Sequence, residues 1–176
     1  MNINLLIKNY VNNRKEHKRK IGRYWASDLY SILTGRLRPT NFLKEKKMDI
    51  QSCRNILRGQ EKENTLKNIL DFNKIDYKYQ EKKVENINGF ELVVVTDFFF
   101  KDRILETKAP SIMPESIRKY EYPQLEAQYR VFKKPVYVMY LGSGANKSYV
   151  YIPSDKLWKT IIEALTDFHK KVCQLE

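Results

Sequence analysis

Two carboxylates and one lysine stand close together in a mostly apolar stretch, VVVTDFFFKDRILETK at residues 93–108. Asp97 follows one apolar run, and Glu106 and Lys108 lie two residues apart in the next run. On a strand, this spacing places Glu106 and Lys108 on the same face. Carboxylate oxygens suit magnesium or manganese, and a lysine can hold or help deprotonate a water. The stretch therefore predicts a centre that hydrolyses phosphodiester bonds.

Strands and helices around this stretch must position the three side chains. Apolar runs predict strands at residues 75–79, 89–100 and 102–108, with turn residues at 86–89 between the first two and a tight turn between the last two. A later hairpin is predicted from residues 136–141 and 148–152. Capping residues and apolar periodicity predict helices after Ser27, after Asp49, from Pro114 to Lys134, and after Ser154. This order predicts an α/β sandwich with a central mixed sheet flanked by helices.

Length and charge narrow the class of protein. The chain has 176 residues, 42% of them hydrophobic, which is enough for the core of one globular domain. The net charge of +12 favours a polyanionic partner, because a basic surface gains free energy by releasing counterions condensed on nucleic acid. A membrane surface is the competing partner, but no apolar run approaches the roughly 18 residues of a spanning helix. The N-terminal residues do not form a signal peptide, so we expect an intracellular, cytoplasmic protein.

Basic and aromatic residues in the first quarter of the chain are candidates for nucleic-acid contacts. The run RKEHKRKIGR at residues 14–23 suits either a phosphate backbone or plain solvent exposure. Arg36 and Arg38 lie in a basic loop, and Tyr24 is a candidate for stacking on an unpaired base. Core packing is the alternative role for such aromatic residues.

Four short motifs follow one another along the chain, each on a predicted helix or strand. They are Gly59-x-x-x-Glu63, Asp97, Glu106-x-Lys108 and QLEAQY at residues 124–129. This succession resembles the PD-(D/E)XK nucleases, in particular the RecB-like branch that includes the CRISPR-associated exonucleases. The resemblance covers residues 24–141 and implies a restriction-endonuclease-like α/β sandwich.

The resemblance also implies a role for each matching residue in the two strands. Asp97, Glu106 and a backbone carbonyl, that of Thr107 or of Leu105, would bind Mg²⁺ or Mn²⁺. Lys108 would position the attacking water.

The two helix motifs leave alternatives open. Glu63 would complete the metal site, with the nearby Glu61 as the alternative. Gln124 is favoured over Gln128 as the glutamine that faces the centre. The family usually has a tyrosine four residues after its glutamine, whereas Tyr129 follows Gln124 by five. Gln128 and Tyr129 are therefore further candidates for DNA contacts.

The cysteines separate this chain from part of the family. CRISPR-associated relatives carry four cysteines that hold an iron–sulfur cluster, whereas this chain has only Cys53 and Cys173. We therefore expect no iron–sulfur cluster, and we predict that both cysteines are buried, free thiols.

Together these inferences predict a single nuclease domain over residues 1–176, with a basic segment at 1–23, a core at 24–152 and a C-terminal helix at 153–176. The expected activity is that of a deoxyribonuclease, acting as an exonuclease on DNA ends or single strands in replication, recombination or repair. A dimeric structure-specific endonuclease of the junction-resolvase kind and a non-catalytic nucleic-acid-binding relative are the alternatives, and homo-oligomers stay open. Richness in Tyr, Ile, Asn and Lys hints at an A+T-rich genome of viral or mobile-element origin, which would place the protein in the host cytoplasm.

Overall fold

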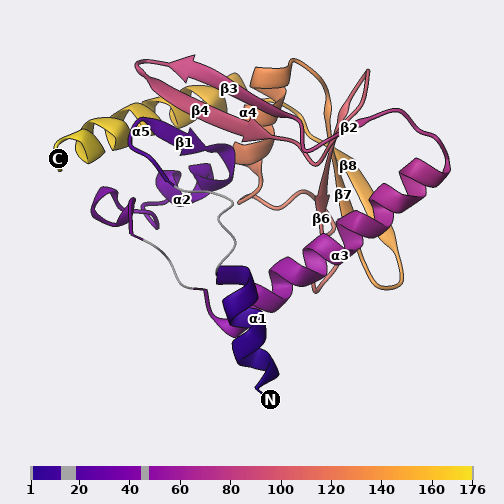
Figure 1. Cartoon of the computed structure of the whole chain (residues 1–176). Coiled ribbons are helices and arrows are strands. Elements are labelled where there is room, and N and C mark those ends of the chain that lie inside the picture. Colours follow the sequence, from indigo (N-terminus) through magenta and orange to yellow (C-terminus); the bar gives the residue numbers. More distant parts are fainter. Residues whose placement is uncertain (1, 13–18, 45–47, 176) are drawn as a thin grey trace.

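Figure 1 shows the computed structural model, which describes residues 2–12, 19–44 and 48–175. The helices are α1 (Ile3–Asn12), α2 (Leu29–Leu33), α3 (Ile50–Phe72), α4 (Tyr122–Phe132) and α5 (Asp155–Cys173), with 3-10 turns at Ala26–Asp28 and Pro39–Asn41. The strands are β1 (Arg23–Trp25), β2 (Lys78–Tyr79), β3 (Lys82–Ile87), β4 (Phe90–Val95), β5 (Phe98–Phe99), β6 (Ile104–Lys108), β7 (Val136–Leu141) and β8 (Asn146–Val150). Half of the basic run at residues 14–23 lies outside the described residues.

The strands form two mixed sheets, one ordered β1-β4-β3 and the other β2-β5-β6-β7-β8. β1 runs parallel to β4 and β6 parallel to β7, while the other neighbours are antiparallel. The predicted α/β class, with mixed sheets flanked by helices, is confirmed. The strands are divided between two sheets, a detail that the sequence did not indicate.

The division between the sheets falls beside Asp97. The sequence predicted one strand over residues 89–100, but the chain leaves the first sheet after β4 and enters the second at β5. At this step the Thr96 N–H donates to the Glu81 carbonyl, and the Asp97 carbonyl accepts from the Gln80 N–H, both at 3.0 Å. A continuous apolar run cannot reveal such a break, because both strands are largely buried.

A two-residue turn at Asn88-Gly89 joins β3 to β4, with Ile87 paired to Phe90. The φ angles of Asn88 and Gly89 are 48° and 87°, as a type I′ turn requires, and both residue types tolerate such angles. The turn was predicted correctly, but the strand before it was placed at residues 75–79. β3 itself is mostly exposed and lacks alternating apolar residues, so its pattern is that of a polar loop.

The long helices begin at their capping residues. Asp49 accepts a hydrogen bond from the Ser52 N–H at 2.7 Å at the start of α3, and α3 then continues through Gly59 without a break. The predicted Ser154 cap of α5 is confirmed, because its hydroxyl accepts from the Leu157 N–H at 3.3 Å. No described helix, α3 and α5 included, is long and apolar enough to cross a membrane.

Two predictions about helix starts are wrong. Ser27 lies in a 3-10 turn before α2 and caps no helix. α4 begins at Tyr122 rather than at Pro114, with Pro123 in its first turn, where the missing N–H of proline removes no helical hydrogen bond. The segment between Pro114 and α4 is consequently a loop that is free to line a site.

Tyr24 lies in the core rather than on the surface. Its side chain is fully buried, its hydroxyl is 2.9 Å from Nδ1 of His169, and the rings of Phe42 and Phe168 pack against it. The prediction that Tyr24 stacks on a base is therefore wrong, because no base can reach this ring while the core is intact.

The two cysteines differ in burial. Cys53 on α3 is buried, as predicted, and Cys173 at the end of α5 is exposed, contrary to the prediction. Both thiols are free. The last turn of α5 faces solvent at position 173, which the apolar character of cysteine does not reveal.

Candidate active site

Glu106 on β6 is almost completely buried, with 2% of its surface exposed. The Lys108 Nζ donates to Glu106 Oε1 at 2.7 Å, and the Gln124 amide donates to the same oxygen at 2.8 Å. The Gln128 amide donates to Oε2 at 2.6 Å. These three donors fix the carboxylate, and all of them come from β6 and α4.

Gln124 and Gln128 lie one turn apart on α4, so both amides point toward β6. The sequence left open which of them faces the centre, and both contact Glu106. Gln128 is fully buried and also donates to the Val95 carbonyl at 2.9 Å. Its prediction as a DNA contact is therefore wrong, because its amide is enclosed and positions Glu106.

Asp97 is held by the strand that carries Glu106. Its Oδ2 accepts hydrogen bonds from the N–H and the hydroxyl of Thr107, each at 2.7 Å. Burial, together with the charges of Glu106 and Glu63, raises the pKa of Asp97 to about 8. An acid whose ionisation is opposed by two other carboxylates marks a place where a cation would bind favourably.

Lys108 lies near Asp97 and shares strand β6 with Glu106. Burial by itself would lower the pKa of Lys108, but the Glu106 and Asp97 carboxylates outweigh it and raise the pKa above its usual value. Besides its bond to Glu106, the Nζ lies 3.4 Å from Gln124 Oε1. The ammonium group thus stays protonated, which favours orienting a water over removing its proton.

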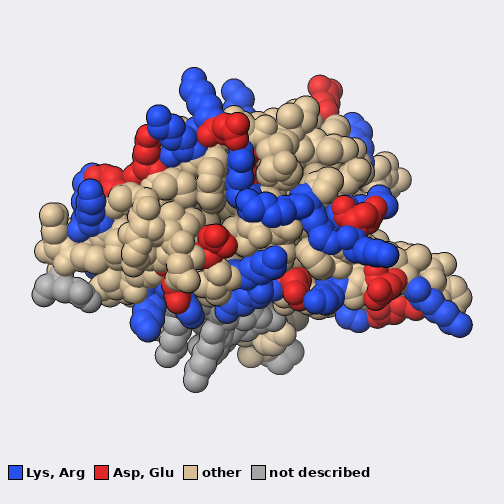
Figure 2. Space-filling view, turned by 90° about the horizontal axis from the view of Figure 1, so that it is seen from above, with Lys and Arg blue, Asp and Glu red and all other residues tan. Residues whose placement is uncertain are grey.

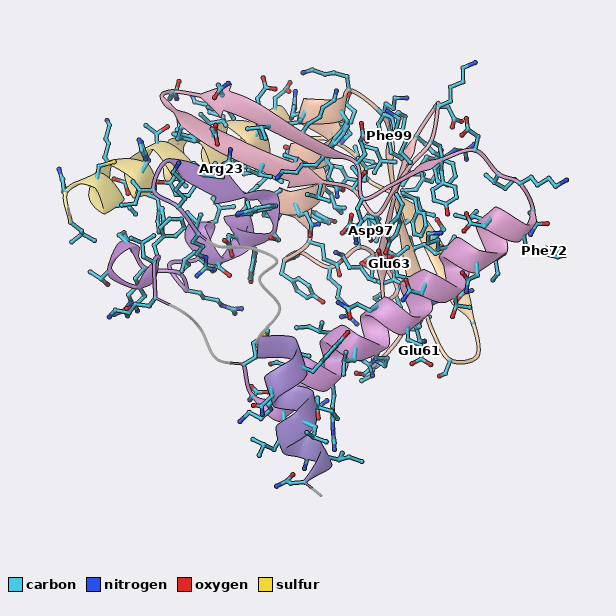
Figure 3. All side chains as sticks on the ribbon, viewed as in Figure 1. Arg23, Glu61, Glu63, Phe72, Asp97 and Phe99 are labelled. Atoms are coloured by element: carbon cyan, nitrogen blue, oxygen red, sulfur yellow. The ribbon has the colours of Figure 1, made fainter. Side chains whose placement is uncertain are left out.

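Helix α3 brings Glu63 to the same centre. In Figure 3, Glu63 and Asp97 lie beside each other, and Glu61 lies on the other side of the helix. Glu63 Oε1 accepts from the Tyr79 hydroxyl at 2.7 Å, and the charge of Glu63 contributes to the raised pKa of Asp97. Glu61 is exposed. Of the two acids that the sequence left open, Glu63 is the one that faces the centre.

Polar contacts hold α3 against the strands. Arg58 donates to the Ala109 carbonyl just after β6 at 3.1 Å, and Lys62 donates to the Leu141 carbonyl at the end of β7 at 2.7 Å. Both contacts lie on the turn of α3 that leads to Glu63. Neither residue was predicted, because basic residues in a charged helix give no signal of contact with a strand end.

The oxygen atoms gathered here suit a hard divalent cation. Asp97 and Glu106 supply carboxylates, and the Thr107 backbone supplies a carbonyl. Gln128 Oε1 is a further buried oxygen without a hydrogen-bond partner in the described part of the chain. Across residues 2–12, 19–44 and 48–175, no three His, Cys, Asp or Glu side chains already stand at the spacing of a metal cluster. The oxygen donors of Asp97, Glu106 and Thr107 nevertheless fit Mg²⁺ or Mn²⁺ by their chemistry.

A pocket of about 400 Å³ opens beside Lys108. Its lining comes from the segment around α2, the end of β6, the loop before α4 and α4 itself: Ser27, Tyr30, Ser31, Lys108, Ala109, Pro110, Arg118, Tyr120, Glu121 and Gln124. The Arg36 guanidinium lies 5.2 Å from the centroid of the Tyr30 ring, which packs against Tyr120 with centroids 6.0 Å apart. Arg36 thus lies beside one lining residue of the pocket, and its role as a DNA contact stays a prediction. Arg118 and Tyr120 were missed because their loop was predicted as helix.

The fold is similar to those of solved proteins that include exonucleases. The structure of a protein designated SSO0001 matches with a TM-score of 0.71 and 16% identity, covering 96% of this chain and 85% of that chain. An alkaline exonuclease from Laribacter hongkongensis matches with a TM-score of 0.58 and 12% identity, over 88% of this chain and 92% of that one. A phage-related exonuclease from Haemophilus somnus 129PT matches with a TM-score of 0.56 and 13% identity, over 94% of this chain and 97% of that one.

Sequence comparison adds nothing to this similarity, since no family model and no curated protein matches the chain. At such low identities the structural matches show the fold, which is the mixed α/β fold of these exonucleases. The function must therefore be argued from the site.

Proposed function

We propose that the protein is a Mg²⁺- or Mn²⁺-dependent deoxyribonuclease that hydrolyses phosphodiester bonds at DNA ends or in single strands. The observation that carries the proposal is the buried Glu106, bonded to Lys108 and two glutamines beside Asp97. Two exonucleases share the fold, and the Laribacter enzyme has also been solved in complex with dAMP. The net charge of +12 suits a polyanionic substrate.

Asp97, Glu106 and the Thr107 carbonyl would hold the metal, with Glu63 as a further acidic ligand from α3. Bound there, the metal would stabilise the negative charge that develops on the phosphate in the transition state and lower the pKa of the attacking water. The Thr107 N–H and hydroxyl keep one oxygen of Asp97 occupied. Its other oxygen, Oδ1, would be available to hold the metal.

Lys108 would orient the attacking water. Its protonated Nζ is anchored on Glu106 Oε1 at 2.7 Å and lies 3.4 Å from Gln124 Oε1. A charge fixed in this way can hold a water near the phosphate and stabilise developing negative charge. Gln124 would assist it, and Gln128 would act as a positioning residue for Glu106.

The pocket beside Lys108 would receive the DNA next to the cleaved bond. Arg118 lines it and Arg36 lies beside it, so two guanidinium groups would lie near the phosphates of the DNA. Arg118 is held in place by hydrogen bonds that it donates to the Tyr120 hydroxyl and the Ile112 carbonyl. The exposed Arg38 of the same loop and the half-buried Tyr129 stay predicted DNA contacts. A nucleic acid in this pocket would lie against the side chains that surround Glu106.

Incubation with magnesium of three DNA substrates tests the proposal: end-labelled linear DNA, closed circular single strands and four-way junctions. Cleavage of linear DNA alone is the expected result. Cut circles or junctions would support a dimeric structure-specific endonuclease instead. If no DNA is cut in either magnesium or manganese while DNA still binds, the protein is a non-catalytic binder and the proposal fails.

A further inference from the structure

Four lysines lie on neighbouring segments around the C-terminal end of α4, and we call them the upper lysine cluster. Its members are Lys83, Lys101, Lys133 and Lys134. They come from β3, from the turn between β5 and β6, and from the residues after α4. Figure 2 views the molecule from above and shows a band of lysine and arginine side chains across the middle of that view. The candidate active site does not use any of the four.

Two phenylalanine rings hold the cluster together. Phe99 and Phe132 pack with their ring centroids 5.4 Å apart. The Lys134 Nζ lies 4.4 Å from the centroid of Phe99, and the Lys83 Nζ lies 5.0 Å from the centroid of Phe132. Lys134 also donates to the Lys101 carbonyl. Residues distant in sequence thus place like charges within one small area.

Carboxylates offset the charge of this area only in part, because Asp102, whose pKa is lowered chiefly by its hydrogen bond to Arg103 and also by the charge of Lys134, lies beside it. Among the ion pairs of the described residues, none involves a lysine of the cluster. The neighbouring Asp102 pairs with Arg103 at 2.9 Å. Because like charges repel, the arrangement becomes favourable when an anion with several charges binds across it.

Stabilisation of the C-terminus of α4 explains only part of the cluster. Lys133 and Lys134 follow α4, where positive charge interacts favourably with the helix dipole. This does not account for Lys83 and Lys101, which belong to other elements. Lys133 has a φ of 56°, a left-handed conformation that glycine adopts more easily and that costs a lysine about 1 kcal/mol. A lysine at this position therefore carries a conformational penalty that glycine would avoid.

The cluster lies at the far end of the elements that carry the catalytic centre. β6 starts near Lys101 and ends at Lys108, and α4 has Gln124 in its first turn and ends before Lys133. At about 3.3 Å per strand residue and 1.5 Å per helix residue, the two places are roughly 15 Å apart. A nucleic acid that touches both must extend several nucleotides beyond the cleaved bond.

We propose that the upper lysine cluster binds the phosphate backbone of DNA away from the cleaved bond, so that longer substrates are held at two places. The proposal rests on the proposed function for the identity of its ligand. Lysine ammonium groups contact phosphates as point charges and read no base, so the contact is independent of sequence.

Binding of labelled DNA, measured by fluorescence anisotropy in EDTA, tests this proposal without cleavage. The variant carries Lys83→Glu, Lys101→Glu and Lys133→Glu, and Lys134 is kept because it donates to backbone carbonyls. The matched control carries Lys156→Glu, Lys159→Glu and Lys170→Glu on α5, which changes the net charge equally. If the glutamate variant does not fold, the same three positions are changed to glutamine.

We expect the cluster variant to bind a strand of about 40 nucleotides at least about tenfold more weakly, with a salt-dependence slope smaller by about 2. Binding of a strand of about 2 nucleotides should stay within about threefold, because at about 3.4 Å per nucleotide it is too short to reach both places. The control should lose less than about threefold on the long strand.

Equal losses for the cluster variant and the control, or equal losses on both strands, would overturn the proposal. So would loss of binding to phosphatidylserine vesicles with DNA binding unchanged, which would assign the cluster to a membrane surface. Since the measurement is made in EDTA, absence of nuclease activity would refute the proposed function without deciding this one.

Discussion

At the scale of single residues, Glu106 is the side chain on which the site converges. Lys108 and both glutamines of α4 donate to it, and its charge opposes ionisation of Asp97. The sequence placed Glu106 and Lys108 on one strand face correctly. It could not show that both glutamines reach the same carboxylate.

Replacement of Lys108 tests the catalytic role. Lys108→Met should lower single-turnover DNA cleavage by about 100- to 1000-fold, because it removes a fixed charge from the reacting phosphate. DNA binding in EDTA should change little. Lys156→Met on the exposed start of α5 is the control and should cleave normally. Cleavage by Lys108→Met within about threefold of wild type would leave Lys108 as only a partner of Glu106.

The raised pKa of Asp97 predicts a pH-dependent stability of the metal-free protein. The pKa of the Asp97 carboxyl is about 8 in the folded state and 3.8 in the unfolded chain. The folded state therefore holds this proton more tightly. The stability that protonated Asp97 contributes is fully present below about pH 4 and is lost as the pH rises through about 8. Asp97→Asn stays neutral, so in EDTA its Tm relative to wild type should rise between pH 5 and pH 8. A constant difference in Tm across this range would contradict the assignment.

At the scale of elements, α3 acts as the support of Glu63. Only Cys53 among its residues is buried, and Arg58 and Lys62 tie it to the ends of β6 and β7. Its position therefore depends on polar contacts more than on apolar burial. The amphipathic pattern predicted the helix itself, but not its contacts with the strands.

Removal of the contact between Lys62 and the end of β7 tests whether polar contacts hold α3 in position. Lys62→Met should raise the magnesium concentration for half-maximal cleavage by about tenfold, because α3 no longer holds Glu63 in place. Thermal unfolding should show that the variant is folded. Lys67→Met on the same helix, which removes only an exposed pair with Asp71, is the control. Equal magnesium requirements for the two variants would mean that Lys62 does not position α3.

At the scale of the whole molecule, the buried Glu126 joins α4 to the segment between β8 and α5. It accepts hydrogen bonds from Arg130 at 2.7 Å, from the Ser154 N–H at 2.9 Å and from the Tyr151 hydroxyl. Because α4 also carries the glutamines of the site, this carboxylate links the assembly of the fold to the position of Glu106.

Glu126→Ala should lower the free energy of unfolding by about 3 kcal/mol, because it leaves Arg130 and Tyr151 without their buried partner. Urea denaturation followed by circular dichroism measures the change. Glu163→Ala, which removes an exposed partner of Lys159 at 3.9 Å, should have little effect. Similar values for both variants would show that the Glu126 contacts are energetically minor.

The sequence pattern predicted an element correctly where contacts between residues close in sequence determine its structure. The Asn88-Gly89 turn, the Ser154 cap and the apolar face of α5 depend on neighbouring residues, and each was predicted. The exposed strand β3 was missed, since its backbone bonds to β4 are made without an apolar side-chain pattern. Tyr24 was predicted to stack on a base, with core packing as the alternative, because its burial depends on distant residues such as His169.

The sequence by itself determined the mixed α/β class and the strand that pairs Glu106 with Lys108, because strand alternation and apolar periodicity are local properties. Only the tertiary structure decided that the chain changes sheets at Asp97, that Glu63 rather than Glu61 faces the centre, and that Gln128 is enclosed. These outcomes depend on contacts between segments distant in sequence, which composition and spacing do not encode.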